Sequence, residues 1–430
     1  MSKSYNSIEI FIARILARSP AIKQKLKKIY SHLSYYIYKK KYKYNSDFEI
    51  NEISKENNET FFGYYDKHPD NGHGLVIVHC TSNSTKVLPR YVDSIAINIY
   101  SINEKKFILN TPIITTAFNW QQGSRAHWLN SDHFIYNDFD QITKEYCAKV
   151  YSVSQQQVVK KITKPVQDSY KDKFILSICY KELARLRPDY GYFKHVDNYN
   201  NRPEHIGIWK NDLTNLETKL ILSLNDIIKF KSNLSNTSFE HKVNHVMISP
   251  NGQNFIFMHR YFNSTGTRFD RLILSDCNGN LLKVLADNGM VSHCFWYNDN
   301  TILAYLRSTN GKDSYWLIDI NSGNYTGFEP WCNKIRGDGH PSVLNNLVIT
   351  DTYPDKSRMQ SLYLSQKNSN LEYKLGEFFH GFDFNGETRC DLHPRFSLCG
   401  NYIFFDSVFS GKRTLYYINI TKIKERINHG

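Results

Sequence analysis

Residues 390–407 read CDLHPRFSLCGNYIFFDS, a histidine followed by a short turn and then an alternating apolar run. The same order occurs three times upstream, in VNHVMISPNGQNFIFMHR (243–260), VSHCFWYNDNTILAYL (291–306) and GDGHPSVLNNLVITDTYP (337–354). Four histidines hold the same place in these units at intervals of 48, 47 and 53 residues: His245, His293, His340 and His393. Self-similarity at such a period is typical of a repeat architecture.

A period of this length leaves room for about four short strands in each unit, which predicts the blades of a β-propeller. Counting backward from His245 adds units near residues 61, 115 and 166. The 30 Tyr and 26 Phe, beside 5 Met and 12 Pro, also favour strands. We predict an all-β fold, a seven-bladed β-propeller over residues 61–430, with six or eight blades as alternatives. Residues 1–45 form a basic helical segment and residues 46–60 a polar linker.

The N-terminal segment is strongly basic. Residues 1–44 hold eleven Lys or Arg and one acid, Glu9, whereas the net charge of the whole chain is +13. Apolar residues recur at helical spacing in two stretches, Ile8, Phe11, Ile12, Ile15 and Leu16, then Ile22, Leu26, Ile29, Leu33 and Ile37. Two basic amphipathic helices fit an anionic membrane surface. The alternative is that they pack on the propeller body or on a partner.

Charge and cysteine usage narrow the function class. The chain after residue 44 is nearly neutral, which argues against a nucleic-acid partner. The eight cysteines form no CxxC pair, which indicates a reducing compartment. Without a signal peptide or an apolar run of roughly 18 residues, we expect a cytoplasmic protein, or one peripheral on the inner membrane. The absence of Walker, Rossmann, HExxH and GxSxG motifs predicts no nucleotide cofactor.

The repeat predicts a site lined by histidines in the central channel of the propeller. If each histidine begins the innermost strand of its blade, all four point toward one end of the channel. His340, Cys390 and His393 would give two imidazoles and a thiolate, a ligand set for a divalent metal such as zinc or manganese. Asp391, Cys294 and His293 are further candidate ligands. The alternative is hydrogen-bonded structural histidines and a buried free cysteine.

Other polar clusters supply candidates for catalysis and substrate binding. In ELARLRPDYGYF (182–193), an arginine could neutralise a substrate carboxylate while a tyrosine transfers a proton. The catalytic candidates are Tyr190, His245, His127 and Arg260. The substrate-binding candidates are Tyr65, Lys67, Gln121, Gln122, Arg187, Arg202 and His293. For each of them, a core or salt-bridged position is the alternative.

These stretches together resemble the oligogalacturonate-lyase and ulvan-lyase group of seven-bladed propellers over roughly residues 61–420. The resemblance is carried by FFGYYDKHPD, NWQQGS, RPDYGY, NHVMISPNGQNFIFMHR, SHCFW, DGHPS, TDTYPD and CDLHPRFS. It implies β-elimination on a uronate, with Tyr190 at the position of the catalytic tyrosine and His245 at that of a channel histidine. It also implies metal-site positions at His340, Cys390 and His393.

Two departures from the family pattern stand out. An arginine expected near PEHIGIW is replaced by His205 and Ile206, so Arg202 or Arg260 would have to neutralise the carboxylate. In DGHPS, Pro341 stands where relatives offer a second thiol.

The first functional hypothesis is a lyase of acidic poly- or oligosaccharides. Similar chains in bacterial surface-polysaccharide gene clusters, often labelled glycosyltransferases, suggest a capsule or O-antigen assembly protein as the second. A protein-interaction propeller is the third.

Overall fold

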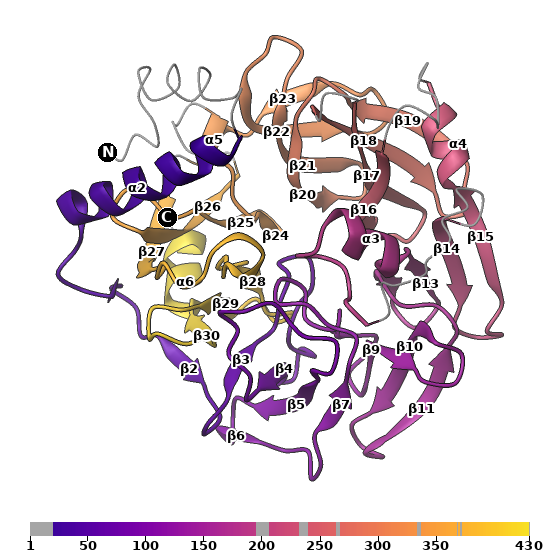
Figure 1. The fold of residues 1–430 in the computed structure, drawn as a ribbon, viewed down its shortest axis with the longest axis horizontal. Coiled ribbons are helices and arrows are strands. Elements are labelled where there is room, and N and C mark those ends of the chain that lie inside the picture. The colour runs from indigo at the N-terminus through magenta and orange to yellow at the C-terminus, as the bar shows by residue number, and fades with distance from the viewer. Residues whose placement is uncertain are drawn as a thin grey trace.

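The computed structural model describes residues 20–194, 206–231, 240–263, 267–332, 337–367, 369 and 372–429. These residues form seven antiparallel sheets arranged as the blades of a propeller around a central axis (Figure 1). The predicted all-β fold and the number of blades are confirmed. In the described part of the chain, no helix is both long and apolar enough to cross a bilayer.

In blades 1–5, the four strands of the main sheet path run outward from the axis in chain order. Blade 1 is β3 (Glu59–Phe61), β4 (Leu75–Thr81), β5 (Ile95–Ser101), β6 (Lys106–Phe107) and β7 (Ile113–Thr115), and blade 2 is β8 (His127–Trp128), β9 (His133–Asp140), β10 (Glu145–Ser152) and β11 (Gln157–Ile162). Blade 3 is β12 (Asp168–Tyr170), β13 (Phe174–Ser177), β14 (Gly207–Asp212) and β15 (Thr218–Ser223), and blade 4 is β16 (Glu240–Ile248), β17 (Asn254–Phe262), β18 (Arg268–Asp276) and β19 (Leu281–Ala286).

Blades 5–7 complete the ring, and blades 6 and 7 each add an N-terminal strand at the outer edge. Blade 5 is β20 (Val291–Asn298), β21 (Thr301–Arg307), β22 (Asp313–Asp319) and β23 (Tyr325–Gly327). Blade 6 is β24 (Ser342–Leu344), β25 (Leu347–Asp351), β26 (Met359–Gln366), β27 (Glu372–Phe379) and β1 (Tyr44–Asn45), and blade 7 is β28 (Arg395–Phe396), β29 (Tyr402–Ser407), β30 (Thr414–Asn419) and β2 (Asn51–Ile53).

The repeated sequence unit folds as a repeated turn. In blade 4 the Ser249 N–H donates to the Asn254 carbonyl at 2.8 Å, and the Gly252 N–H donates to the Ser249 carbonyl at 2.9 Å. Blade 7 repeats both bonds from Ser397 and Gly400 at 2.9 Å each. Both glycines have positive φ, +73° and +70°, which this turn requires. The apolar run after each turn is buried on both faces because each sheet packs between two neighbours.

The ring is closed by strand β2, which pairs antiparallel with β30 as the outer strand of blade 7. Residues 46–60, expected as a linker, thus supply β2 and the start of β3. The linker composition hides them because both strands are only three residues long.

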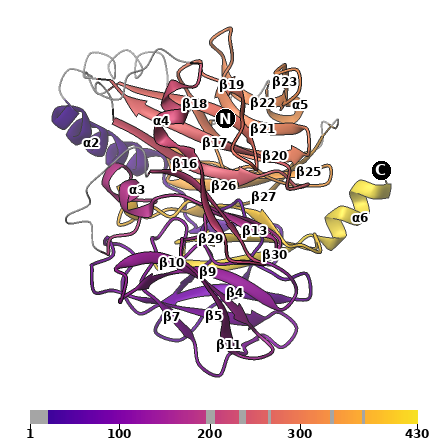
Figure 2. The ribbon, with the colours of Figure 1, turned by 90° about the vertical axis from the view of Figure 1, so that its right-hand side faces the viewer.

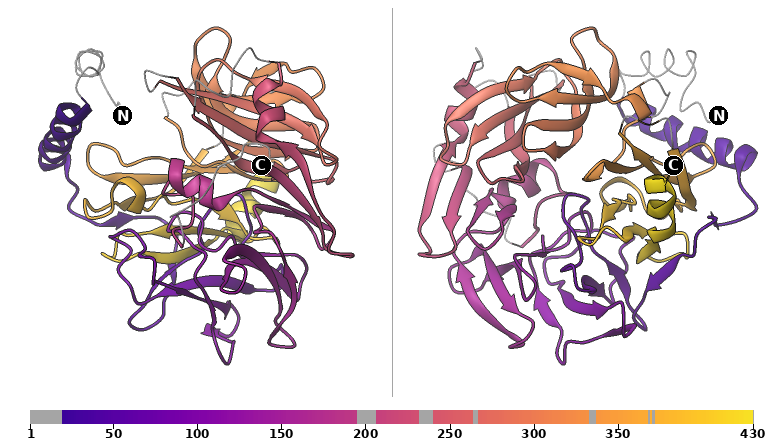
Figure 3. Two further views of the ribbon diagram at one scale, coloured as in Figure 1. Left: turned by 45° about the vertical axis from the view of Figure 1, so that its right-hand side comes forward. Right: turned by 180° about the vertical axis from the view of Figure 1, so that it is seen from behind.

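Helices are few and peripheral: α2 (Pro20–Tyr38), α3 (Tyr180–Leu186), α4 (Leu224–Lys229), α5 (Glu329–Cys332), α6 (Thr421–His429) and the short 3₁₀ turn η2 (Gly386–Thr388). Helices α2 and α3 lie on one side of the propeller and α6 on the other (Figure 2). The view from behind shows α6, in yellow, on the face turned to the viewer (Figure 3, right). The second predicted N-terminal helix corresponds to α2, and the first lies outside the described residues.

Candidate functional site

Four histidine rings from successive blades meet on the channel axis. Ring centroids are 4.1 Å apart for His293 and His340, 4.3 Å for His340 and His393, and 6.2 Å for His245 and His293. All four side chains are buried. Residues nearly 150 positions apart in sequence therefore share one site, because the innermost strands of neighbouring blades lie side by side.

Local distortions of the inner strands aim these rings. The pairing of β16 with β17 shifts register between Asn244 and Met247, and His245 in this bulge has φ of +52°. The pairing of β20 with β21 shifts between Val291 and Cys294, around His293. His393, just ahead of β28, has φ of +44°. Bulges and left-handed backbone at non-glycine residues cluster at functional sites, where they redirect a side chain.

Hydrogen bonds fix which nitrogen of each imidazole faces the centre. His340 Nδ1 lies 2.9 and 3.0 Å from the two oxygens of Asp351, and His393 Nδ1 lies 3.0 Å from the carbonyl of Gly63. Because both partners only accept, each Nδ1 carries a proton, and each ring in its neutral form presents a bare Nε2. His293 Nδ1 is held in the same way, 3.2 Å from an oxygen of Asp338.

These bare nitrogens suit a divalent metal. The Nε2 atoms of His340 and His393 are buried and have no hydrogen-bond partner among the described residues. His340, His393 and Asp391 each offer one ligand atom, a ring nitrogen or a carboxylate oxygen, and these atoms lie within 4.8 Å of one another. Two imidazoles and a carboxylate, with Asp351 behind one imidazole, form a ligand set typical of zinc, manganese or iron. The residues present therefore fit a metal of this class.

Three tyrosines line one wall of the site. The Tyr64 hydroxyl lies 3.1 Å from His245 Nδ1, and the Tyr190 ring packs edge-on against both Tyr64 and His245. Tyr65 lies among the rings of His293, His340 and His393, and its hydroxyl donates to the Cys294 carbonyl at 3.0 Å.

A row of side chains with alternating positive and negative charge borders the site on the side of α3. Arg187 donates to both oxygens of Asp189 at 2.8 and 2.6 Å, and its guanidinium lies 4.6 Å from the centre of the Tyr190 ring. Arg389 lies 3.6 Å from Asp189 and 2.6 Å from Asp391. The side chains of Arg187 and Arg389 keep 23% and 25% of their surface exposed, so this row of charges reaches solvent.

The environment separates the proton affinities of these groups. Burial lowers the pKa of His340, but the Asp351 carboxylate outweighs it, so the pKa is raised. Burial, reinforced by neighbouring positive charge, holds the pKa values of His245 and His393 well below the ordinary value. Burial also raises the pKa of Tyr64 well above its usual range. At neutral pH, the wall therefore pairs an uncharged imidazole with a protonated phenol.

The Cys390 thiol lies outside this ligand group. It is completely buried in an apolar cluster with Phe384 and Val408, and burial raises the pKa of the thiol to about 12. The next residue in sequence, Asp391, supplies a ligand atom instead. Cys294 is likewise a core residue, and burial raises the pKa of its thiol to about 12.

His127 and Arg260 are already engaged elsewhere. His127 Nδ1 lies 2.7 Å from the Arg125 carbonyl and its Nε2 lies 2.8 Å from the Ser169 hydroxyl, so both ring nitrogens are used between blades 2 and 3. Arg260 forms an ion pair with Asp270 at 2.8 Å and donates to the Val291 carbonyl at 3.2 Å. Packing between blades accounts for the positions of both side chains. Of the two, only Arg260 affects His245, because its positive charge helps to lower the pKa of that ring.

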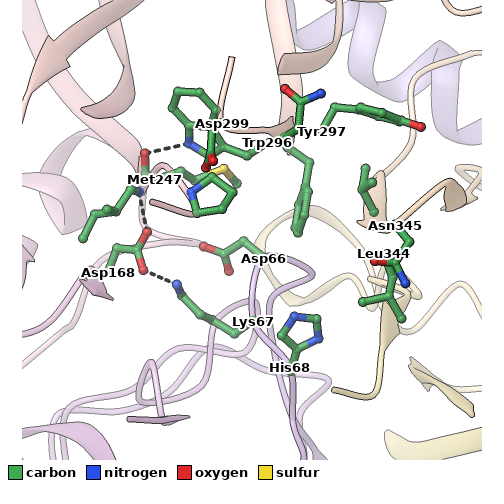
Figure 4. Close-up of a pocket in the computed structure, with 15 residues that line it drawn as sticks. Asp66, Lys67, His68, Asp168, Met247, Trp296, Tyr297, Asp299, Leu344 and Asn345 are labelled. Carbon is green, nitrogen blue, oxygen red and sulfur yellow. Dashed lines mark hydrogen bonds and ion pairs between the residues drawn. The ribbon is translucent and has the colours of Figure 1, made fainter. Parts of the chain in front are cut away.

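Lys67 lines a different cavity, of about 580 Å³, at the far ends of the inner strands (Figure 4). Its walls include Met247 on β16 and Trp296 on β20, which lie beyond the site histidines along the same strands. Lys67 pairs with Asp168, which also accepts the Ile248 N–H at 2.7 Å. Lys67 and Asp168 thus connect blades 1, 3 and 4.

The remaining substrate-binding candidates differ in what they contact. Gln121 Nε2 donates to the Arg389 carbonyl at 2.7 Å and so supports an arginine of the site. The buried Gln122 is held by its N–H, which donates to Asn119 at 2.7 Å. Arg202 lies outside the described residues.

Sequence reasoning passed over several polar residues of the site: Tyr64, Asp189, Asp338, Asp351 as a partner of His340, Tyr353 and Arg389. A usable signal was present for four of them: Tyr64, Asp189, Asp338 and Arg389 each lie within two residues of a candidate residue.

No family model matches the chain, and no curated protein matches it by sequence. Solved structures do match. An oligogalacturonate lyase in complex with manganese is 11% identical with a TM-score of 0.58, over 89% of this chain and 95% of that one. An oligogalacturonate lyase from Vibrio parahaemolyticus is 11% identical with a TM-score of 0.56, over 88% and 96%. At this identity the likeness establishes the fold.

Proposed function

We propose that the protein is a metal-assisted lyase that cleaves uronate-containing oligosaccharides by β-elimination. The observation that carries the proposal is the pair of buried, unpartnered Nε2 atoms of His340 and His393 beside Asp391. The likeness to a manganese-bound oligogalacturonate lyase supports this choice of chemistry. A divalent cation held there would supply positive charge beside the substrate carboxylate and stabilise the negative charge developing on it.

The protein's own groups provide the proton transfers. In β-elimination, the C5 proton leaves, the C4–O4 bond breaks, a C4–C5 double bond forms, and O4 gains a proton. His245, uncharged at neutral pH, can accept the C5 proton, and the phenol of Tyr190 or Tyr64 can protonate O4. Arg187 and Arg389 at the border suit the carboxylates of an acidic chain.

The test is to load the purified full chain with Mn²⁺ or Zn²⁺ and measure bound metal, then the ultraviolet absorbance of unsaturated product from uronate oligomers. We expect His340→Ala and His393→Asn to lose the metal and the activity together. Asn tolerates the left-handed backbone of residue 393 but is too short to reach the site. Cys390→Ala is the matched control and should keep both. Metal retained in both histidine variants would refute the proposal.

A second candidate is glycan binding or transfer during assembly of a surface polysaccharide. It is favoured by the pairing of Arg187 and Arg389 with Asp189 and Asp391, which offsets the positive charge that a lyase would use. In that case, the loaded protein would bind uronate oligomers without releasing unsaturated product.

A further inference from the structure

Helix α2 contacts the propeller through one of its faces. The His32 ring stacks on Phe382 with centroids 4.0 Å apart, and Tyr35 packs against Phe382 at 5.5 Å and Phe379 at 5.6 Å. Ser34 between them is buried. The helix is therefore seated on blade 6 by aromatic and polar side chains.

The apolar residues of α2 lie elsewhere on the helix. Their exposed fractions are 43% for Leu26, 55% for Ile29, 61% for Leu33, and 76% for both Tyr36 and Ile37. We call these five residues the α2 stripe; their spacing of three and four places them on one helical face. Had the helix served only to cover the propeller, these side chains would be its buried ones. A contiguous exposed apolar patch of this kind marks an interaction surface.

The segment that carries the α2 stripe has charge of a single sign. Residues 20–44 contain no Asp or Glu. Lys28 on the helix and Lys39, Lys40, Lys41 and Lys43 just after it are exposed. An apolar face with tyrosine and flanking lysines matches the interface of an anionic bilayer, which accepts apolar side chains and attracts lysine.

We propose that the α2 stripe docks the protein on an anionic membrane surface, with α2 lying in the interface. This inference goes beyond the proposed lyase activity and does not depend on it. The candidate site lies on the same side of the molecule. Helix α3, which leads into Arg187 and Tyr190, shares a face with α2 (Figure 2).

The segments that carry α2 also reach the site. Lys356 lies 5.9 Å from the ring centres of both Tyr30 and Tyr38, and on the same short loop Tyr353 packs against His340 at 5.8 Å. Membrane docking would therefore hold the site close to the bilayer, where it could meet glycans made or anchored there.

The test is sedimentation of the full chain with vesicles of phosphatidylcholine alone or of an equal mixture with phosphatidylglycerol. We expect binding to the mixed vesicles that salt weakens, and a loss of roughly 10-fold or more in Ile29→Glu, Ile37→Glu. The matched control is Ile114→Glu, Ile142→Glu, which replaces isoleucines 58% and 91% exposed on blades 1 and 2 and changes the charge equally. This control should bind as the unaltered protein does.

Three results would overturn the inference. One is mixed-vesicle binding by the stripe variant that equals that of the control. Another is equal binding to neutral and mixed vesicles, which would show that binding does not require anionic lipid. The third is no vesicle binding by the unaltered chain, with the stripe variant changing only its oligomeric state, which would assign the stripe to a second copy of the protein.

Discussion

At the scale of single residues, one carboxylate organises the centre of the site. Asp351 accepts the N–H and the Nδ1–H of His340 with one oxygen, at 2.7 and 2.9 Å. Its other oxygen accepts the His393 N–H at 3.1 Å. Asp351 therefore sets the backbone of both proposed ligand residues and the tautomer of one, although it does not belong to the ligand group.

This arrangement predicts the effect of Asp351→Asn. The amide has only one accepting oxygen, so it cannot serve three N–H donors, and we expect metal affinity to fall roughly 10–100-fold. Competition with a chelator measures the affinity. Asp355→Asn, which alters a turn carboxylate bonded to Ser357 and Met359 on the same loop, should leave it unchanged. Equal affinities in the two variants would mean that Asp351 has only a packing role.

At the scale of elements, the short N-terminal strand β2 closes the propeller. Its pairing with β30 joins the two ends of the ring, and Ile53 is fully buried. A blade without its outer strand exposes an unpaired edge and part of its core. Removing residues 1–54 should thus cost about 4 kcal/mol or more of unfolding free energy, through lost pairing and exposed core. Urea unfolding measures it.

The matched truncation removes only residues 1–41. It deletes α2 but keeps β1 and β2, so the ring stays closed and most of the unfolding free energy should remain. Similar losses in both truncations would show that α2, not β2, stabilises the blades.

At the scale of the whole molecule, buried neutral histidines limit acid stability. His79 Nδ1 lies 2.9 Å from the Phe62 carbonyl, and its Nε2 accepts the Ser124 N–H at 3.2 Å. Burial lowers the pKa of His79 from 6.5 to about 4. Above pH 6.5, the ring is neutral in both states and has no effect. Between pH 6.5 and 4, the unfolded chain takes up the proton first, so stability falls as pH falls.

His79→Gln should therefore flatten the acid limb. Between pH 6 and pH 5, we expect the unaltered protein to lose about 1 kcal/mol more unfolding free energy than the variant. His73→Gln, at an exposed position, is the matched control and should follow the unaltered protein. Parallel pH dependences in all three proteins would show that His79 takes up its proton without unfolding.

The repeat was the sequence feature that determined the propeller. Turn, strand and histidine recur in the same order along the chain, and most strands of a blade are close in sequence, so the period predicted propeller blades and favoured seven of them. It also placed His245, His293, His340 and His393 on or just ahead of the inner strands. The helical spacing of Ile22 to Ile37 predicted α2 for the same reason, because an amphipathic helix is a local pattern.

Only the tertiary structure decided which atoms meet. A thiol and a carboxylate adjacent in sequence point to different surroundings, so Cys390 enters the core while Asp391 joins the ligand group. The partners that fix the tautomers of His293 and His393, Asp338 and the Gly63 carbonyl, come from neighbouring blades. Ring closure by β2 and the exposure of the α2 stripe are also long-range outcomes. Sequence periodicity fixes what forms within a blade; the packing of separate blades fixes where each side chain points.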